Sequence, residues 1–129
     1  MTDAPPPAPP HAIAAILPCS DLDASTAFYE KLGLSVVGDY GSYRLLADGK
    51  GWQLHLTNES QPTWPERDQN PFGLYLYTDQ VAQLAERVRD AIIGPVKAPT
   101  HKPWGIYEFA LSDPDETLVR IGWPSHLIG

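Results

Sequence analysis

The chain has 129 residues, of which 43% are hydrophobic, and this length suits one compact domain or two half-size modules sharing a core. Its net charge of −7 would repel phosphate backbones, so we expect no nucleic-acid partner. Because no apolar run reaches the roughly 18 residues that a bilayer-spanning helix needs, we also expect no membrane partner.

The N-terminal residues 1–11, which include the run PPPAPP, are predicted to form a proline-rich disordered tail ahead of a single domain over residues 12–129. This segment lacks the basic start and the apolar stretch of a secretion signal. The single cysteine, Cys19, permits no internal disulfide bond. We therefore expect a cytoplasmic protein.

A strand over IAAIL opens the first half of the domain. The helix that follows is predicted to begin at Asp21, whose carboxylate can accept from free N–H groups of the first turn, and to end at Gly33. Two strands come next in YGSYRLLADGKGWQLHL. We interpret DGKG as a four-residue turn, so that Ala47 faces Trp52. Residues 59–71, ESQPTWPERDQNP, form the predicted linker.

The second half repeats this order of elements. A strand over GLYLY precedes a helix that is predicted to begin at Asp79. Its apolar residues fall on one helical face: Val81, Leu84, Ala85, Val88 and Ile92. Two strands follow in WGIYEFALSDPDETLVRI. Matching residues of the two halves are 58 positions apart in the helices. They are 64 positions apart at the start of the later strands, where Tyr40 matches Trp104. The alternative is chance similarity between amphipathic segments, but four elements recur in the same order.

The repeat predicts an α+β fold of two paired βαβββ modules, about 12–58 and 72–124, that form a curved mixed sheet with a concave cleft and with helices on the convex side. Since strand side chains alternate, the face opposite each helix is predicted to be polar and aromatic. Its predicted residues are Arg44, Gln53, His55, Tyr75, Tyr77, Glu108 and Arg120.

Two loop tryptophans, Trp64 and Trp104, are predicted to stack on a ligand beside these strand residues. A surface that mixes charges with aromatic rings suits a small organic molecule with flat and polar parts. The sequence therefore predicts that all nine residues bind such a ligand. The alternative is that they are ordinary solvated positions of a one-sided antiparallel sheet.

These motifs, SDLDASTAFYEKLGL in the first module and PWGIYEFALSDPDETLVRIGWP in the second, make the chain resemble the vicinal oxygen chelate superfamily. That superfamily includes glyoxalase I, fosfomycin resistance enzymes, extradiol dioxygenases and bleomycin resistance proteins. The resemblance covers about residues 13–124. The closing arrangement WGxxEFxxxDP is similar to the bleomycin resistance branch, except that DPDET stands where DPDGN is common.

In enzymes of that superfamily, His, Glu or Gln from the first and last strands of each module hold a divalent metal, and the resemblance implies where such ligands would stand in this chain. The matching positions are Ala14, His55, Gly73 and Arg120, and only His55 can bind a metal. The permanent positive charge of Arg120 would repel a cation. We therefore expect no metal, no other cofactor and no catalytic residue.

The expected function is metal-free sequestration of an antibiotic or a similar organic ligand, in a cleft that the resemblance places between the two chains of a homodimer. A cationic or glycopeptide-type antibiotic would suit Glu108 and the acidic surface, although Arg44 and Arg120 make the cleft less acidic. Three alternatives stay open. The first is a metal-dependent lyase, isomerase or dioxygenase, and the second is metal-free acid–base catalysis by Glu108 or His55. The third is a regulatory or accessory module whose groove receives a peptide or a protein.

Overall fold

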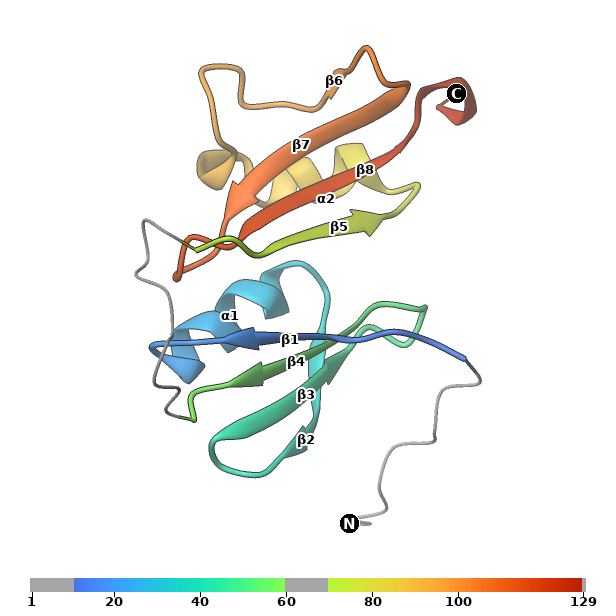
Figure 1. Ribbon diagram of the computed structural model, residues 1–129. Helices are drawn as coiled ribbons and strands as arrows, with labels where there is room; N and C mark the ends of the chain where they lie inside the picture. The colour runs from blue at the N-terminus through green and yellow to red at the C-terminus, as the bar shows by residue number, and fades with distance from the viewer. Residues whose placement is uncertain (1–10, 60–69, 129) are drawn as a thin grey trace. The chain divides into compact units, whose positions relative to one another are not determined.

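The computed structural model describes residues 11–59 and 70–128, and the chain divides into two compact units at residues 64 and 65. Each unit contains one four-stranded mixed sheet and one α-helix (Figure 1). Residues 1–10 of the predicted tail and most of the predicted linker lie outside the described residues. No described helix has the length and apolar character needed to cross a bilayer.

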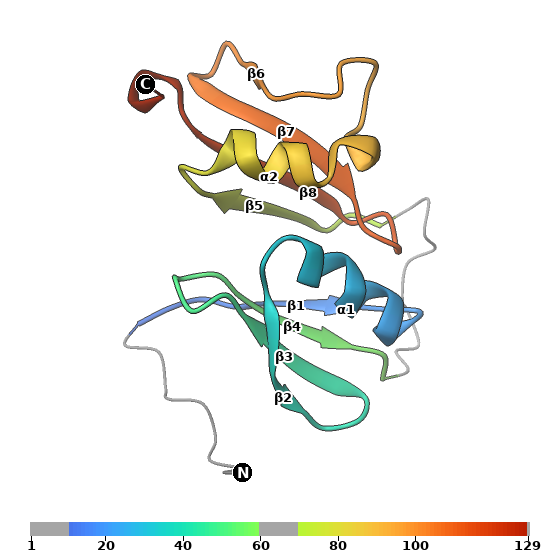
Figure 2. The same cartoon turned by 180° about the vertical axis from the view of Figure 1, so that it is seen from behind.

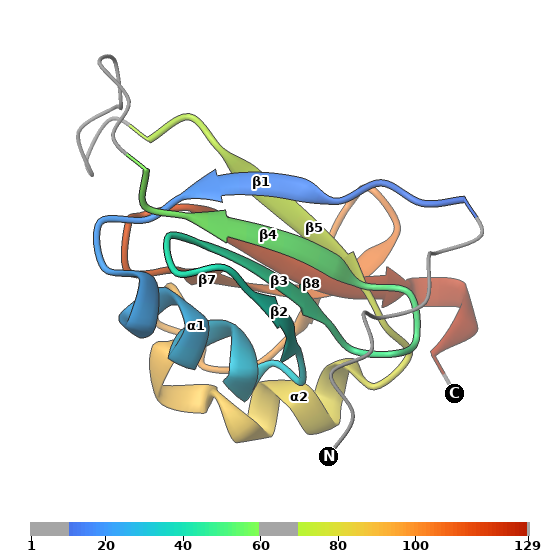
Figure 3. The same ribbon diagram turned by 90° about the horizontal axis from the view of Figure 1, so that it is seen from below.

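In the first unit the sheet order is β1-β4-β3-β2, with β1 parallel to β4 and the other neighbours antiparallel. The elements are β1 (Ala15–Pro18), α1 (Leu22–Lys31), β2 (Ser35–Asp39), β3 (Tyr43–Ala47) and β4 (Gln53–Thr57). Figure 3 shows α1 lying along one face of this sheet. The buried leucines of the strands, Leu17, Leu46, Leu54 and Leu56, form the core of this unit.

The second unit has the same arrangement, with the order β5-β8-β7-β6 and β5 parallel to β8. Its elements are β5 (Gly73–Tyr77), α2 (Val81–Arg87), β6 (Thr100–His101), β7 (Ile106–Ser112) and β8 (Leu118–Pro124), with 3-10 turns at Arg89–Ala91 and Ser125–Leu127. Helix α2 crosses one face of the sheet (Figure 2). The predicted α+β class and the repeated module are confirmed.

The two helices begin differently. Asp21 caps α1 as predicted, because its Oδ1 accepts a hydrogen bond from Ala24 N at 3.1 Å. The prediction that Asp79 caps α2 is wrong: the N-cap is Gln80, which makes no side-chain cap bond. Asp79 instead accepts a hydrogen bond from the side chain of Gln80. Helix α2 also ends earlier than its apolar pattern indicates, since the buried Ile92 follows a 3-10 turn.

The β3–β4 hairpin has a loop over residues 48–52, one residue longer than predicted. Ala47 pairs with Gln53 rather than with Trp52, and Arg44 pairs with Leu56. Directly opposed residues of an antiparallel pair share a face. Arg44 therefore lies on the same side of the sheet as the buried leucine, which is the side that α1 covers.

The contacts of Arg44 agree with this register. Its guanidinium donates to Thr26 Oγ1 on α1 at 2.9 Å and lies 2.8 Å from the carboxylate of Asp23. The prediction that Arg44 shares the polar face with Gln53 and His55 is therefore wrong. The physical reason is the extra loop residue, which exchanges the two faces of β3 relative to β4.

Both hairpins close with an aspartate in the loop. Asp48 Oδ1 accepts hydrogen bonds from the backbone N–H groups two and four residues further along, at 2.8 and 2.9 Å. Asp113 Oδ1 does the same in the β7–β8 loop, at 2.9 Å for both. Because its side chain can satisfy two N–H groups that the turn leaves unpaired, aspartate stabilises this loop. Asp113 is also buried, whereas Asp48 is half-buried.

We expect Asp113→Ala to lower the free energy of unfolding by about 1–3 kcal/mol, because it leaves two N–H groups without their acceptor in a buried loop. Urea unfolding followed by circular dichroism measures the loss. Asp48→Ala is the matched control, and we expect a smaller effect because water can reach its loop. An Asp113→Ala protein as stable as the wild type would contradict this account.

Candidate ligand-binding site

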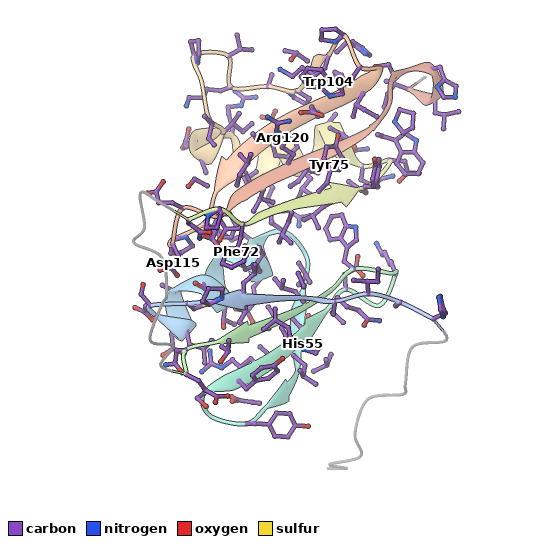
Figure 4. All side chains as sticks on the ribbon, in the orientation of Figure 1. His55, Phe72, Tyr75, Trp104, Asp115 and Arg120 are labelled. Carbon is purple, nitrogen blue, oxygen red and sulfur yellow. The ribbon has the colours of Figure 1, made fainter. Side chains whose placement is uncertain are left out.

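Glu108 on β7 is only 3% exposed, and two aromatic side chains donate hydrogen bonds to its carboxylate. Tyr75 Oη donates to Oε1 at 2.8 Å, and Trp104 Nε1 donates to the same oxygen at 3.1 Å. The other oxygen, Oε2, lies 3.8 Å from Nε of Arg120. We call these four residues the Glu108 cluster, and Figure 4 labels the three that surround the carboxylate. Burial of a carboxylate is costly unless it is paired and hydrogen-bonded, and the cluster provides both.

The strand register brings the cluster together on the face opposite α2. Tyr75 on β5 pairs with Arg120 on β8, and Glu108 on β7 pairs with Gly122 on β8. A Cβ atom at Gly122 would lie 2.4 Å from Tyr75 Oη and 2.8 Å from Glu108 Cβ. The absence of a side chain at Gly122 therefore leaves the space in which the Tyr75–Glu108 hydrogen bond forms.

Aromatic rings extend the cluster towards solvent. The rings of Tyr75 and Tyr77 have centroids 4.7 Å apart, and Tyr77 is 55% exposed. Trp104 is 57% exposed, and the guanidinium carbon of Arg120 lies 6.0 Å from the centre of its ring. Flat rings beside a cation form a surface on which a ligand with its own ring system can stack.

A hollow of about 330 Å³ adjoins the cluster within the second unit. Three members of the cluster line it: Trp104, Glu108 and Arg120. Lys102 and apolar residues of the loop 92–98 form other parts of its wall. Its volume lies at the lower end of the range of about 300–1,000 Å³ that is usual for small-molecule sites.

The phenol of Tyr75 is held in its protonated form. Burial, and then the hydrogen bond to Glu108, raise the pKa of Tyr75 above its ordinary value of 10.0. The negative charge of Glu108 acts in the same direction, while Arg120 opposes it. Near neutral pH this phenol is therefore a hydrogen-bond donor and not a base or an anionic metal ligand.

A related polar pair lies on the helix-free face of the first unit. Tyr43 Oη and His55 Nδ1 are 2.8 Å apart, and their rings meet edge to face with centroids 5.4 Å apart. Positions 65 residues apart correspond in the two hairpins. Tyr43 and His55 therefore occupy the positions that Glu108 and Arg120 hold in the second unit.

Of the nine residues predicted to bind a ligand, those that the structure describes are divided between the two units and between the two faces of their sheets. Four of them form the Glu108 cluster, and Tyr77 lies beside it. Gln53 and His55 lie on the helix-free face of the first unit, while Arg44 lies on the opposite face. Trp64 lies outside the described residues. That these residues bind a ligand stays a prediction.

Sequence reasoning missed two residues of the site, Gly122 and Lys102. A glycine inside a strand often marks a close approach by another group, and Gly122 in RIGWP carries that signal. No comparable signal identifies Lys102. Its position follows from the β6–β7 turn, in which its backbone N–H donates to Ile106 O at 2.8 Å.

The residues at the mapped metal positions do not fit a divalent cation. The strand register puts Ile16 beside His55 and Tyr75 beside Arg120. These two residues lie two positions after Ala14 and Gly73, which the sequence had suggested. Neither pair offers a set of imidazole and carboxylate ligands. Among the described residues, no group of three or more His, Cys, Asp and Glu side chains could hold a metal ion.

The chain belongs to the Glyoxalase/Bleomycin resistance protein/Dioxygenase superfamily, because the sequence profile of that family matches residues 9–121. This confirms the resemblance seen in the sequence. The matched region contains both helices, all four members of the Glu108 cluster and both hairpins up to residue 121 of β8.

Proteins that confer resistance to antibiotics or bind them are similar to this chain. A bleomycin resistance protein from Klebsiella pneumoniae is 28% identical over 81% of this chain and 86% of its own length. The crystal structure of a bleomycin-binding protein complexed with bleomycin has 26% identity and a TM-score of 0.70, and covers 88% of this chain and 98% of that one. TnmS3, an antibiotic-binding protein from Streptomyces sp. CB03234, has 27% identity and a TM-score of 0.71, with 92% and 98% covered.

We expect Gly122→Ala to lower the free energy of unfolding by about 1–3 kcal/mol, because the new methyl group overlaps Tyr75 and Glu108. Urea unfolding measures the change. Gly73→Ala is the matched control on the same sheet, since its Cβ would meet only Leu118 O, at an ordinary 3.5 Å. Equal losses in the two variants would show that the close contacts at Gly122 do not matter.

The raised pKa of Tyr75 predicts how stability changes with pH. Above about pH 10 the unfolded chain releases the phenolic proton while the folded chain retains it, so stability falls as pH rises. Tyr75→Phe removes this contribution, and we expect its stability to fall less steeply there. Urea unfolding at several alkaline pH values measures the slope, with Tyr40→Phe, in the other unit, as the control. A Tyr75→Phe slope as steep as that of the wild type would be evidence against a retained proton.

Proposed function

We propose that this protein binds and sequesters a small organic ligand, an antibiotic or a molecule like it, without a metal ion. The site is the helix-free face of the second unit, around the Glu108 cluster and the adjoining hollow. The tyrosine and tryptophan rings stack on flat parts of the ligand, and Arg120 meets a polar group. Similarity to proteins named for binding bleomycin and other antibiotics supports this function.

The observation that carries the proposal is the state of Glu108. Its Oε1 accepts from Tyr75 and Trp104, and Oε2 faces Arg120, so the carboxylate has partners before any ligand arrives. A general base must reach the proton that it removes, and a buried carboxylate with two hydrogen bonds to one oxygen and a guanidinium beside the other is poorly placed to do so. The arrangement favours binding over turnover, and it fits no divalent metal.

The proposal includes a homodimer in the cytoplasm. A hollow of about 330 Å³ accommodates only part of a large antibiotic, so a second chain would supply the remaining wall of the cleft. The one cysteine, Cys19, is buried, and a single cysteine cannot form an internal disulfide, which suits a reducing compartment.

We expect Trp104→Leu to weaken binding of an antibiotic ligand about tenfold, the loss that follows from removing a stacking anchor worth about 1.4 kcal/mol. Isothermal titration calorimetry with bleomycin and a panel of aromatic antibiotics, in buffer containing EDTA, measures the affinity. Trp123→Leu is the matched control, because Trp123 pairs with Tyr107 on the other face of the same sheet. Sedimentation of the same samples measures the assembly state.

Two results would contradict the proposal. The first is binding that appears only after a divalent metal is restored, which would indicate a metal site. The second is conversion of the bound molecule into a product, which mass spectrometry of the titrated sample detects and which would indicate an enzyme.

A further inference from the structure

We infer that the ligand carries a carboxylate group beside its apolar or aromatic part, and that Lys102 and Arg120 bind this carboxylate. The inference rests on the proposed function, because it names the chemical class of molecule that the same site takes. It departs from what the overall charge of −7 suggests, namely a cationic ligand. The local arrangement of charges around the hollow carries the argument.

The charged side chains that line the hollow are Lys102, Glu108 and Arg120. One carboxylate against two cations leaves a single positive charge in this part of the wall. Charges elsewhere on the surface are screened over about 8 Å at physiological salt, so the groups that touch the ligand decide its preferred charge. A ligand with one negative charge neutralises the hollow.

Glu108 is a poor partner for a cationic ligand although it lines the hollow. Its side chain is buried, Oε1 accepts from Tyr75 and Trp104, and Oε2 faces the guanidinium of Arg120. At Oε1 a ligand ammonium would have to displace Tyr75 or Trp104, and at Oε2 it would meet the positive charge of Arg120. The displaced donor would then lose its acceptor, which cancels much of the gain.

Lys102 and Arg120, in contrast, line the hollow with donors that a ligand can reach. Arg120 is 45% exposed in its side chain, and its contact with Glu108 joins Nε to Oε2 at 3.8 Å, longer than a hydrogen bond. Within the described ranges, the Lys102 ammonium makes no hydrogen bond or ion pair, and the Arg120 guanidinium makes no hydrogen bond. A guanidinium fork matches a carboxylate through two parallel hydrogen bonds, and an ammonium adds a third donor.

The loop 92–98 supplies the apolar wall for the rest of the ligand. Ile93 and Val96 are more than half exposed although they line the hollow. The loop is held against β7, because Ile93 N donates to Ala110 O at 2.9 Å. Lys97 fixes it further, since its Nζ donates to Ile92 O at 2.5 Å. An aromatic body can therefore lie between this wall and the ring of Trp104.

Three probes of similar shape test the charge preference: 2-naphthoate, neutral 2-naphthamide and 2-naphthylmethylammonium. Titrations that follow tryptophan fluorescence measure their affinities for the full chain. We expect 2-naphthoate to bind at least tenfold more tightly than the amide, and the ammonium probe to bind most weakly. Raised salt should weaken binding of 2-naphthoate more than that of the amide.

Substitutions then identify the groups responsible. We expect Arg120→Gln and Lys102→Gln each to weaken 2-naphthoate binding about fivefold or more, and by a larger factor than they weaken binding of the amide. Lys50→Gln, which removes an exposed positive charge from the first unit, is the matched control and should leave both affinities unchanged. Lys102→Gln tests the inference even if Arg120→Gln disturbs folding through Glu108.

The outcomes separate the inference from the proposed function. Equal or tighter binding of the ammonium probe, or 2-naphthoate binding that survives both substitutions, overturns the carboxylate inference and leaves a ligand-binding site in place. Failure of all three probes also contradicts the inference, while the antibiotic titrations judge the proposed function independently.

Discussion

A carboxylate that is almost wholly removed from water must receive hydrogen-bond donors or a positive charge, and the site of this protein follows from meeting that requirement at Glu108. Tyr75 and Trp104 donate to it, and Arg120 faces its other oxygen. Gly122 is needed because any larger residue would occupy the space of the Tyr75–Glu108 contact. The same requirement fixes the phenol as a donor, holds the tryptophan beside the hollow and accounts for the arginine beside Oε2.

The sequence predicted much of the fold, because the repeat and the alternation of side chains are local signals. The faces of β7 and β8 were assigned correctly, which brought Tyr75, Glu108 and Arg120 to one surface. The error at Arg44 arose from one extra loop residue. In both hairpins the loop has five residues and begins with an aspartate. A comparison with DPDET in the second module would therefore have shown that the loop of the first module is DGKGW and not the four residues DGKG. Lys102 could not have been predicted, since a lysine in a loop has no periodicity that assigns it to a face.

Membership of the superfamily defines the fold but does not separate its binding proteins from its enzymes, since one fold can carry many chemistries. Our proposal therefore rests on the side chains of the helix-free faces. In corresponding positions of the two hairpins stand a tyrosine–histidine pair, Tyr43 with His55, and a carboxylate–guanidinium pair, Glu108 with Arg120. Within its own unit, His55 contacts Tyr43, and Glu108 contacts Tyr75, Trp104 and Arg120. A site built in this way holds its shape without a metal and offers rings and donors to a ligand, which is why we favour sequestration.

The most direct test of this account is a double-mutant cycle on the Tyr75–Glu108 pair. It compares the free energies of unfolding of the wild type, Tyr75→Phe, Glu108→Ala and the double variant in urea, because alanine leaves no side-chain acceptor for the phenol. A hydrogen bond from a phenol to a buried carboxylate predicts a coupling energy of about 1.5–3 kcal/mol. A coupling energy below about 0.5 kcal/mol, which is the additivity expected of independent residues, would contradict the claim that Glu108 organises the site.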